Sequence, residues 1–238
     1  MSPEHLTGLK RIILVFALLA VAPLYARVIP AIETAALIPD VQVLDEAGNE
    51  TSLRTMLATM GSGPVVVMPI YTRCTASCPL QTQRLKQALA ALNPAAPVRV
   101  LVFSFDPEET PGSISQYRTR ESVPESWKII RARLDAIRSF FGFFHYAVMN
   151  DKGEFIHPDQ IFLLDPSLQW RFTVAGLNWS PQEIGQALGQ ARSLGIMTWV
   201  RTHPDALAWA GFSSVLFSIG LLGIWLVRYK PPNRSIAS

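Results

Sequence analysis

The chain has 238 residues, of which 49% are hydrophobic and only 16% are charged, and its net charge is +3. Ordinary soluble domains carry roughly 25% charged residues, so this composition favours a membrane-associated protein. The length allows one medium-sized domain plus membrane segments, but it excludes two large domains. The basic residues are spread along the chain without forming a basic stripe, which argues against a nucleic-acid partner.

Two apolar runs flank the middle of the chain. The first, residues 12–26, extends to residue 32 if Arg27 reaches toward the interface, and 12–32 is therefore a predicted N-terminal membrane anchor or signal segment. We favour an uncleaved anchor, because no convincing cleavage site follows. The second run, residues 206–227, contains no charge, and as a helix it would cover roughly 33 Å, which matches a hydrocarbon core of about 30 Å. It predicts a transmembrane helix.

Basic residues next to these runs predict the orientation of the chain. Two precede the first run and three follow the second. The positive-inside bias then places the tails, residues 1–11 and 228–238, in the cytoplasm and the middle region, residues 40–195, outside it. The N-terminus does not resemble a mitochondrial transit peptide. We therefore expect a protein of a bacterial inner membrane whose middle domain works in the periplasm.

The middle region alternates predicted strands and helices. The run 64–71 is continuously apolar and rich in β-branched residues, which is typical of a central strand buried on both faces, and 98–105 is interpreted as a second buried strand. This order predicts an α/β fold, a thioredoxin-like sandwich with a mixed central sheet and helices on both faces. The expected strands are 41–45, 64–71, 98–105, 127–131, 161–164 and 170–174, and the expected helices are 52–60, 80–92, 113–119, 134–141 (stopped by Gly142) and 181–194 (capped by Ser180).

The chain has two cysteines, Cys74 and Cys78, in the segment 71–79, YTRCTASCP. The segment lies where a buried strand leads into a helix, and both a helix N-terminus and the adjacent Arg73 stabilise a thiolate. Residues four apart lie on one side of a helix, so the two sulfurs can either close a disulfide or hold a soft metal ion. A purely structural disulfide would close only a very small loop, where the entropic gain is least. The pair therefore predicts a redox or metal-binding role.

Three linked motifs resemble those of the Sco/SenC family of copper-binding assembly proteins. The first is the cysteine segment 71–79, and the second is 103–111, FSFDPEETP, a strand that ends in Ser-x-Asp-Pro and is followed by Thr-Pro. The third is 157–166, HPDQIFLLDP, a histidine that opens a hydrophobic strand. The resemblance covers roughly residues 64–175. It departs between the cysteines, where the family commonly carries Pro-Asp and this chain has residues 75–77, TAS.

The resemblance implies that Cys74, Cys78 and His157 bind copper. Two thiolates and one imidazole suit Cu(I) and tolerate Cu(II), whereas zinc in a structural site usually takes a fourth protein ligand. Asp106 follows a strand at the same predicted sheet edge, so it either caps the turn before Pro107 or supports the site or a docking partner. Metal binding needs reduced cysteines, so copper loading and disulfide formation exclude each other.

The remaining histidines and candidate methionines are expected to be structural. His5 and His203 are interpreted as surface residues. His145 stands among aromatic residues, which favours a core or hydrogen-bonded position. Met68 and Met149 could add a soft ligand, but we expect both in the core.

The function that the resemblance implies is a membrane-anchored copper metallochaperone that delivers copper to the copper centre of an oxidase. Its partners would be the subunit that carries that centre and an upstream copper donor or thiol reductant. The alternative is a thiol-disulfide reductase that keeps the client's copper-ligating cysteines reduced, with Cys74 and Cys78 as the catalytic redox pair. A thiol peroxidase is disfavoured because Thr72 stands two residues before Cys74, whereas those enzymes use a Thr-x-x-Cys spacing.

Overall fold

The computed structural model describes residues 28–30, 36–92, 97–151 and 154–202. The chain divides into two compact units, Met1–Gly195 and Ile196–Ser238. The fold described below is that of the first unit.

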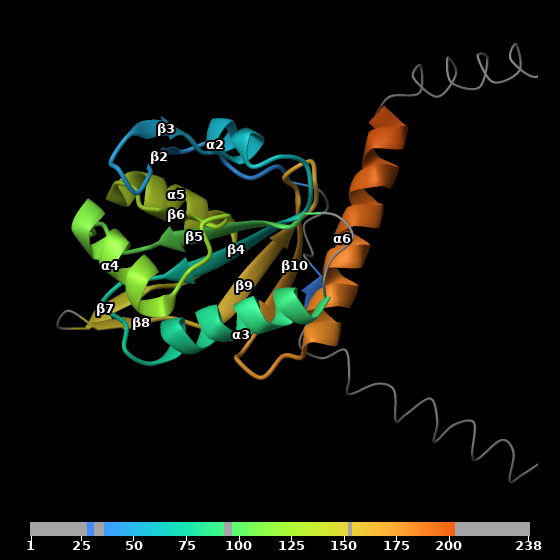
Figure 1. The fold of residues 1–238 in the computed structure, drawn as a ribbon. Helices are drawn as coiled ribbons and strands as arrows, with labels where there is room; N and C mark the ends of the chain where they lie inside the picture. Colours follow the sequence, from blue (N-terminus) through green and yellow to red (C-terminus); the bar gives the residue numbers. More distant parts are fainter. Residues whose placement is uncertain (1–27, 31–35, 93–96, 152–153, 203–238) are drawn as a thin grey trace, which may run out of the picture. The chain divides into compact units, whose positions relative to one another are not determined.

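A six-stranded mixed sheet forms the centre of this unit (Figure 1). Its strand order is β1-β10-β9-β4-β5-β6. The first three strands of that order and β4 are joined by antiparallel pairing, whereas β4, β5 and β6 run parallel. The predicted mixed sheet is confirmed. The strands are β1 (Val28–Pro30), β4 (Val65–Ile70), β5 (Arg99–Ser104), β6 (Lys128–Ile130), β9 (Gln160–Leu164) and β10 (Trp170–Ala175).

Two hairpins lie outside the main sheet. The hairpin of β2 (Gln42–Leu44) and β3 (Glu50–Ser52) confirms the short strand expected at 41–45. The hairpin of β7 (Met149–Asp151) and β8 (Glu154–Ile156) was not expected, because its strands are only three residues long and mix polar with apolar residues without a clear strand pattern. It matters for function, since β8 ends directly before His157.

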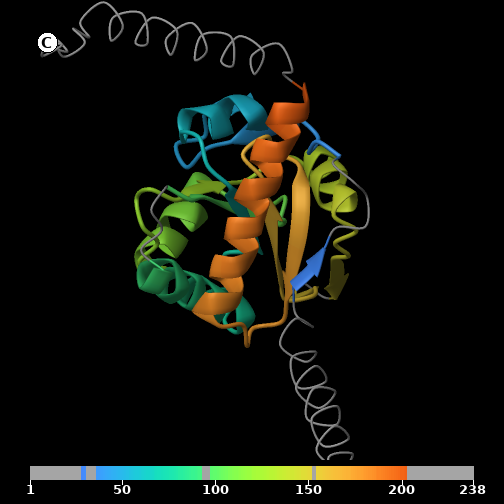
Figure 2. The ribbon, with the colours of Figure 1, turned by 90° about the vertical axis from the view of Figure 1, so that its right-hand side faces the viewer.

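Helices cover both faces of the sheet, as the sequence predicted (Figures 1 and 2). The alternation of side chains along β4 explains this, because Val66 and Met68 pack with α3, α4 and the first part of α6, whereas Val65 and Val67 pack with α2 and α5. The helices are α2 (Leu53–Thr59), α3 (Ser77–Leu92), α4 (Pro111–Glu121), α5 (Leu134–Phe143) and α6 (Pro181–Thr202).

Three helix ends bear on the sequence predictions. Helix α3 begins at Ser77, three residues earlier than expected, and so includes Cys78 in its first turn. Gly142 does not stop α5, which runs to Phe143, so that prediction was wrong. The expected cap of α6 is confirmed, because the Ser180 hydroxyl accepts the N–H of Glu183 while the Glu183 carboxylate accepts the N–H of Ser180.

Most of the predicted membrane segments, namely residues 12–27, 31–32 and 206–227, lies outside the described residues. The part of the first segment that is described, Val28–Pro30, was assigned wrongly, because it forms edge strand β1. There its backbone pairs with β10, which would otherwise leave an open sheet edge. In the part of the chain that the structure describes, no helix is long and apolar enough to cross a membrane.

Candidate metal centre

The loop between β4 and α3 brings the two thiols together. Cys74 and Cys78 are both unpaired thiols, with only 4% and 1% of their surfaces exposed. The backbone N–H of Cys78, in the first turn of α3, donates to the sulfur of Cys74 over 3.4 Å. The loop closes on itself, because the N–H of Cys74 donates to the carbonyl of Tyr71 over 3.1 Å. The free N–H groups at the start of a helix therefore point at Cys74, as its position in the sequence suggested.

The two thiols have opposite acidities. The hydrogen bond from the Cys78 thiol lowers the pKa of Cys74 to about 3. Burial acts in the opposite direction and raises this pKa, but contacts with His157 and with the N–H groups of Cys78 and Ala76 lower it further. The same hydrogen bond, together with burial, raises the pKa of Cys78. The first proton therefore leaves Cys74, and the second stays on Cys78, where it is shared in an S–H···S bond.

His157 lies directly after β8, half-buried beside Cys74. Its Nδ1 is 2.9 Å from the hydroxyl of Tyr146 and 3.2 Å from the carbonyl oxygen of Pro158. Burial acts to lower the pKa of His157, but hydrogen bonds with Cys74 and Pro158, and the charge of Asp159, outweigh it and raise the pKa. The structure thus brings the predicted imidazole to the first of the two predicted sulfurs.

The bond to Pro158 indicates which nitrogen of His157 is available. A carbonyl oxygen can only accept, so Nδ1 carries the hydrogen in that bond. In the neutral ring this leaves the lone pair on Nε2. An outer partner that fixes the tautomer in this way is typical of metal-binding histidines.

Aromatic rings pack against the imidazole of His157. The centre of the His157 ring lies 5.0 Å from that of Phe105 and 5.9 Å from that of Tyr71, and Phe155 packs on Tyr71 at 5.1 Å. Burial, together with the charge of Cys74, raises the pKa of Tyr71 to about 12, so this phenol keeps its proton at neutral pH. These rings limit the movement of the imidazole and lower the polarity around the sulfurs.

The three candidate ligands form a chain of contacts with Cys74 in the middle. Cys74 interacts with Cys78 on one side and with His157 on the other. Among the described residues, however, no three His, Cys, Asp or Glu side chains are already grouped as a metal-binding cluster. Metal binding by Cys74, Cys78 and His157 therefore stays a prediction at this point.

Other sequence candidates fall in different places. Met68 is fully buried, as expected, and its sulfur lies 3.9 Å from the hydroxyl of Thr82. The core position expected for Met149 was wrong, because this residue is 61% exposed on the β7–β8 hairpin. His145 is also exposed, since it follows the end of α5 with a φ of +53° and turns away from the core. His5 and His203 lie outside the described residues.

Asp106 lies near the cysteine loop but does not touch the sulfurs. Its side chain is 2% exposed, forms an ion pair of 2.8 Å with Arg73, and accepts the N–H of Glu108 over 2.9 Å. It therefore caps the turn after β5 and also holds the residue next to Cys74. The guanidinium of Arg73 points at Asp106. The acidity of Cys74 therefore comes mainly from the hydrogen bond of the Cys78 thiol, and less from the positive charge of Arg73 that the sequence suggested.

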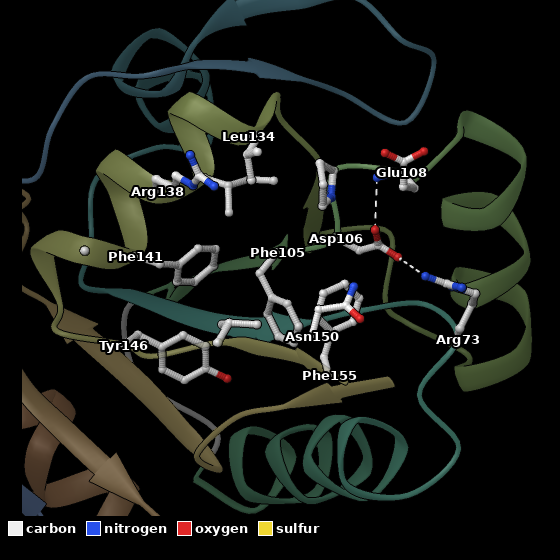
Figure 3. Close-up of a pocket in the computed structure, with 14 residues that line it drawn as sticks. Arg73, Phe105, Asp106, Glu108, Leu134, Arg138, Phe141, Tyr146, Asn150 and Phe155 are labelled. Carbon is white, nitrogen blue, oxygen red and sulfur yellow. Dashed lines mark hydrogen bonds and ion pairs between the residues drawn. The ribbon is translucent and has the colours of Figure 1, made fainter. Parts of the chain in front are cut away.

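A pocket of about 500 Å³ is lined in part by Phe105 and Tyr146, which also contact His157 (Figure 3). Its floor is aromatic, and the ion pair of Arg73 with Asp106 stands at one side of it. Sequence reasoning did not find this pocket, because its walls come from the loop after β5, from α5 and from the unexpected β7–β8 hairpin.

Two further residues of the site were also missed. Tyr146 contacts His157, and the buried carboxylate of Glu109 accepts hydrogen bonds from Thr72 in the cysteine loop. The available signals were weak: Tyr146 stands in an aromatic run, and Glu109 lies in the second motif three residues after Asp106.

These features define a thioredoxin-like α/β protein with a buried dithiol and an imidazole at one edge of its sheet. The family model described as SCO1/SenC matches residues 31–191, and the chain belongs to this family. A search of curated proteins finds no match.

Solved structures resemble the chain over about two thirds of its length. A protein from Aquifex aeolicus VF5 with a suggested role in electron transfer is 28% identical, and the match covers 68% of this chain and 95% of that one, with a TM-score of 0.61. Arabidopsis thaliana ScoI with copper bound is 14% identical over 66% of this chain and 98% of that one, with a TM-score of 0.57. BsSco, described as a Sco-family cytochrome c oxidase assembly protein with a disulfide switch, is 19% identical over 66% and 94%, with a TM-score of 0.56. The last two show the fold alone.

Proposed function

We propose that this chain is a membrane-anchored copper metallochaperone that binds copper through Cys74, Cys78 and His157 and delivers it to the copper centre of an oxidase. The observation that carries the proposal is the position of Cys74, which contacts both the second thiol and the imidazole. Cys74 and His157 are 83 positions apart in the chain, so their contact supports a site that the fold assembles from distant segments.

The donor chemistry suits copper in its reduced state. Thiolates are preferred by Cu(I), and an imidazole nitrogen is accepted by both oxidation states. Cys74 is already a thiolate at neutral pH, whereas Cys78 holds its proton, so loading would release that proton and replace the S–H···S bond by two metal–sulfur bonds. Nε2 of His157 would complete the set. Because the residues form a chain of contacts and not a closed cluster, the imidazole would move slightly as the ion enters.

The placement of the ligands suits a protein that gives its metal away. Both cysteines are nearly buried, but they lie in a loop and in the first turn of a helix, and His157 lies after a hairpin. A client could displace three ligands on separate segments one at a time. Copper-bound Arabidopsis thaliana ScoI shares the fold, and the description of BsSco names cytochrome c oxidase assembly, which supports an oxidase as the client.

The location is proposed from the sequence. Apolar runs at 12–26 and 206–227, with basic residues beyond each, support two membrane segments and a domain in the bacterial periplasm. That arrangement would place the cysteine site on the same side of the membrane as an exported copper centre.

The unequal acidity of the cysteines favours a second candidate, a thiol-disulfide reductase for the client's copper-ligating cysteines. The Cys74 thiolate would attack a client disulfide and form a mixed disulfide. Cys78 would then attack Cys74, giving the Cys74–Cys78 disulfide, while its proton goes to the departing client thiolate. Two electrons pass from this pair to the client, and the pair must be reduced again by a thiol donor.

Metal loading of histidine variants tests the main proposal. The purified full-length chain, reduced and loaded with Cu(I), is compared with His157→Ala and with His145→Ala, which removes an exposed histidine twelve residues earlier. We expect one copper per chain for the wild type and His145→Ala, and a loss of affinity of at least about tenfold for His157→Ala. Equal affinity and spectrum in all three would remove His157 from the site. Retained reduction of client disulfides by His157→Ala, together with its loss in Cys74→Ser, would favour the reductase.

A further inference from the structure

Glu109 is a buried carboxylate in the loop between β5 and α4, and it contacts the cysteine loop across 37 positions of sequence. Its surface is 6% exposed. One oxygen accepts the backbone N–H of Thr72 over 2.7 Å, and the other accepts the Thr72 hydroxyl, also over 2.7 Å. Thr72 stands two residues before Cys74. Both polar hydrogens of one loop residue are therefore held by a single side chain.

Hydroxyl groups complete the environment of this carboxylate. Ser104, the last residue of β5, donates to it over 3.1 Å, and Ser113 in the first turn of α4 donates to the second oxygen. Burial of a carboxylate is costly unless its oxygens are matched by donors, and here the donors come from the cysteine loop, a strand and a helix. Glu109 thus ties three elements together at one point.

Two other contacts fix the same part of the cysteine loop. The guanidinium of Arg120, in α4, donates to the carbonyl oxygen of Thr72 over 2.8 Å. Arg73 is held by Asp106 at 2.8 Å. The β5–α4 region therefore holds the loop at Thr72 and Arg73, just before Cys74. Of the three side chains that make these contacts, only Glu109 binds a backbone N–H of the loop.

We propose that Glu109 is a positioning residue for the dithiol, acting through Thr72. It holds the start of the loop so that the sulfur of Cys74 meets both the N–H and the thiol of Cys78. This inference rests on the proposed function of the cysteine pair, in either its metal-binding or its reductase form. An ordinary structural role would affect only the free energy of unfolding, whereas a positioning role also changes the chemistry of the pair.

The direction of the change follows from what the loop geometry stabilises. The reduced pair gains from the S–H···S bond and from the N–H of Cys78, both of which need Cys74 in place. A loosened loop weakens these contacts in the reduced state, while a disulfide keeps its covalent bond. Loss of Glu109 should therefore shift the thiol–disulfide equilibrium toward the disulfide.

The test uses Glu109→Gln, with Glu108→Gln as the matched control, because Glu108 is an exposed neighbour of the same charge. The readout is the equilibrium of the full-length chain with glutathione, which does not depend on copper. We expect Glu109→Gln to favour the disulfide by roughly three- to tenfold, since one charged hydrogen bond is lost and each tenfold corresponds to about 1.4 kcal/mol. Glu108→Gln should match the wild type.

A second pair of variants changes Thr72, the other partner of this contact, so that the conclusion does not depend on how well Glu109→Gln folds. Thr72→Val removes the hydroxyl partner and should shift the equilibrium in the same direction, whereas Thr72→Ser keeps it and should restore the wild-type value. An unchanged equilibrium in both Glu109→Gln and Thr72→Val, with only lower melting temperatures, would overturn the proposal. Failure of the wild type to bind copper would count against the metallochaperone and leave this result standing.

Discussion

The substitution Tyr146→Phe removes a single oxygen atom, and it tests how the orientation of His157 affects copper binding while the packing around the ring stays the same. Tyr146 is 5% exposed, and its ring lies 5.4 Å from Phe141, 5.7 Å from Phe162 and 6.0 Å from Phe105. Tyr146→Phe keeps these aromatic contacts. It deletes only the hydroxyl that lies 2.9 Å from Nδ1 of His157.

The expected effects of Tyr146→Phe differ in size for folding and for binding. One neutral hydrogen bond contributes about 1 kcal/mol, so the melting temperature should fall by only about 2–4 °C. Outer partners of metal-binding histidines typically contribute 10–100-fold to affinity. Because the carbonyl of Pro158 still holds Nδ1, we expect the low end of that range, a loss of about tenfold in Cu(I) affinity.

Competition with a chromophoric Cu(I) chelator measures that affinity for the wild type, Tyr146→Phe, His157→Ala and the double variant. If the hydroxyl acts through His157, Tyr146→Phe has no further effect once His157 is replaced. Wild-type affinity in Tyr146→Phe, or an equal loss in both backgrounds, would refute the reasoning.

Two further predictions concern the thiols and two glycines. Because the pKa of Cys74 is lowered to about 3, its alkylation rate in the reduced chain should stay nearly constant from about pH 8 to about pH 5, whereas the alkylation of an ordinary thiol slows about tenfold per pH unit. Cys78 should react far more slowly than Cys74. A tenfold slowing of Cys74 alkylation per pH unit would contradict the prediction. Gly63→Ala should destabilise the fold by roughly 1–3 kcal/mol in denaturant unfolding, because its Cβ would lie 2.2 Å from the carbonyl oxygen of Pro97. Gly142→Ala, inside helix α5 with open space around the added methyl group, should instead stabilise the fold by up to about 1 kcal/mol. Equal effects of the two substitutions on the free energy of unfolding would contradict the different surroundings described for Gly63 and Gly142.

The central part of the fold was predictable because it depends on local pattern. The continuous apolar run at 64–71 became β4 and the mostly apolar run at 98–105 became β5. Both strands are buried at every position, as expected for strands covered by helices on both faces. The strand-to-helix position of Cys74 and Cys78 followed from the same runs. Local spacing was enough to bring these two sulfurs together.

The rest of the site depends on contacts between distant segments, which local pattern does not encode. The hairpin that ends before His157 has two strands of three residues that mix polar and apolar side chains and are mostly exposed, so its sequence shows no strand pattern. The aromatic run that contains His145 suggested a core or hydrogen-bonded position, but helix α5 ends two residues before it and the backbone turns outward. The burial of Glu109 could not be predicted, because the hydroxyl groups that make it favourable come from three other places in the chain.

X-ray absorption at the copper edge of the Cu(I)-loaded, reduced full-length chain tests the central claim most directly. The account predicts two sulfur neighbours and one imidazole nitrogen around copper, and the loss of that nitrogen alone in His157→Ala. A copper ion without two sulfur neighbours, or a nitrogen contribution unchanged in His157→Ala, would contradict it.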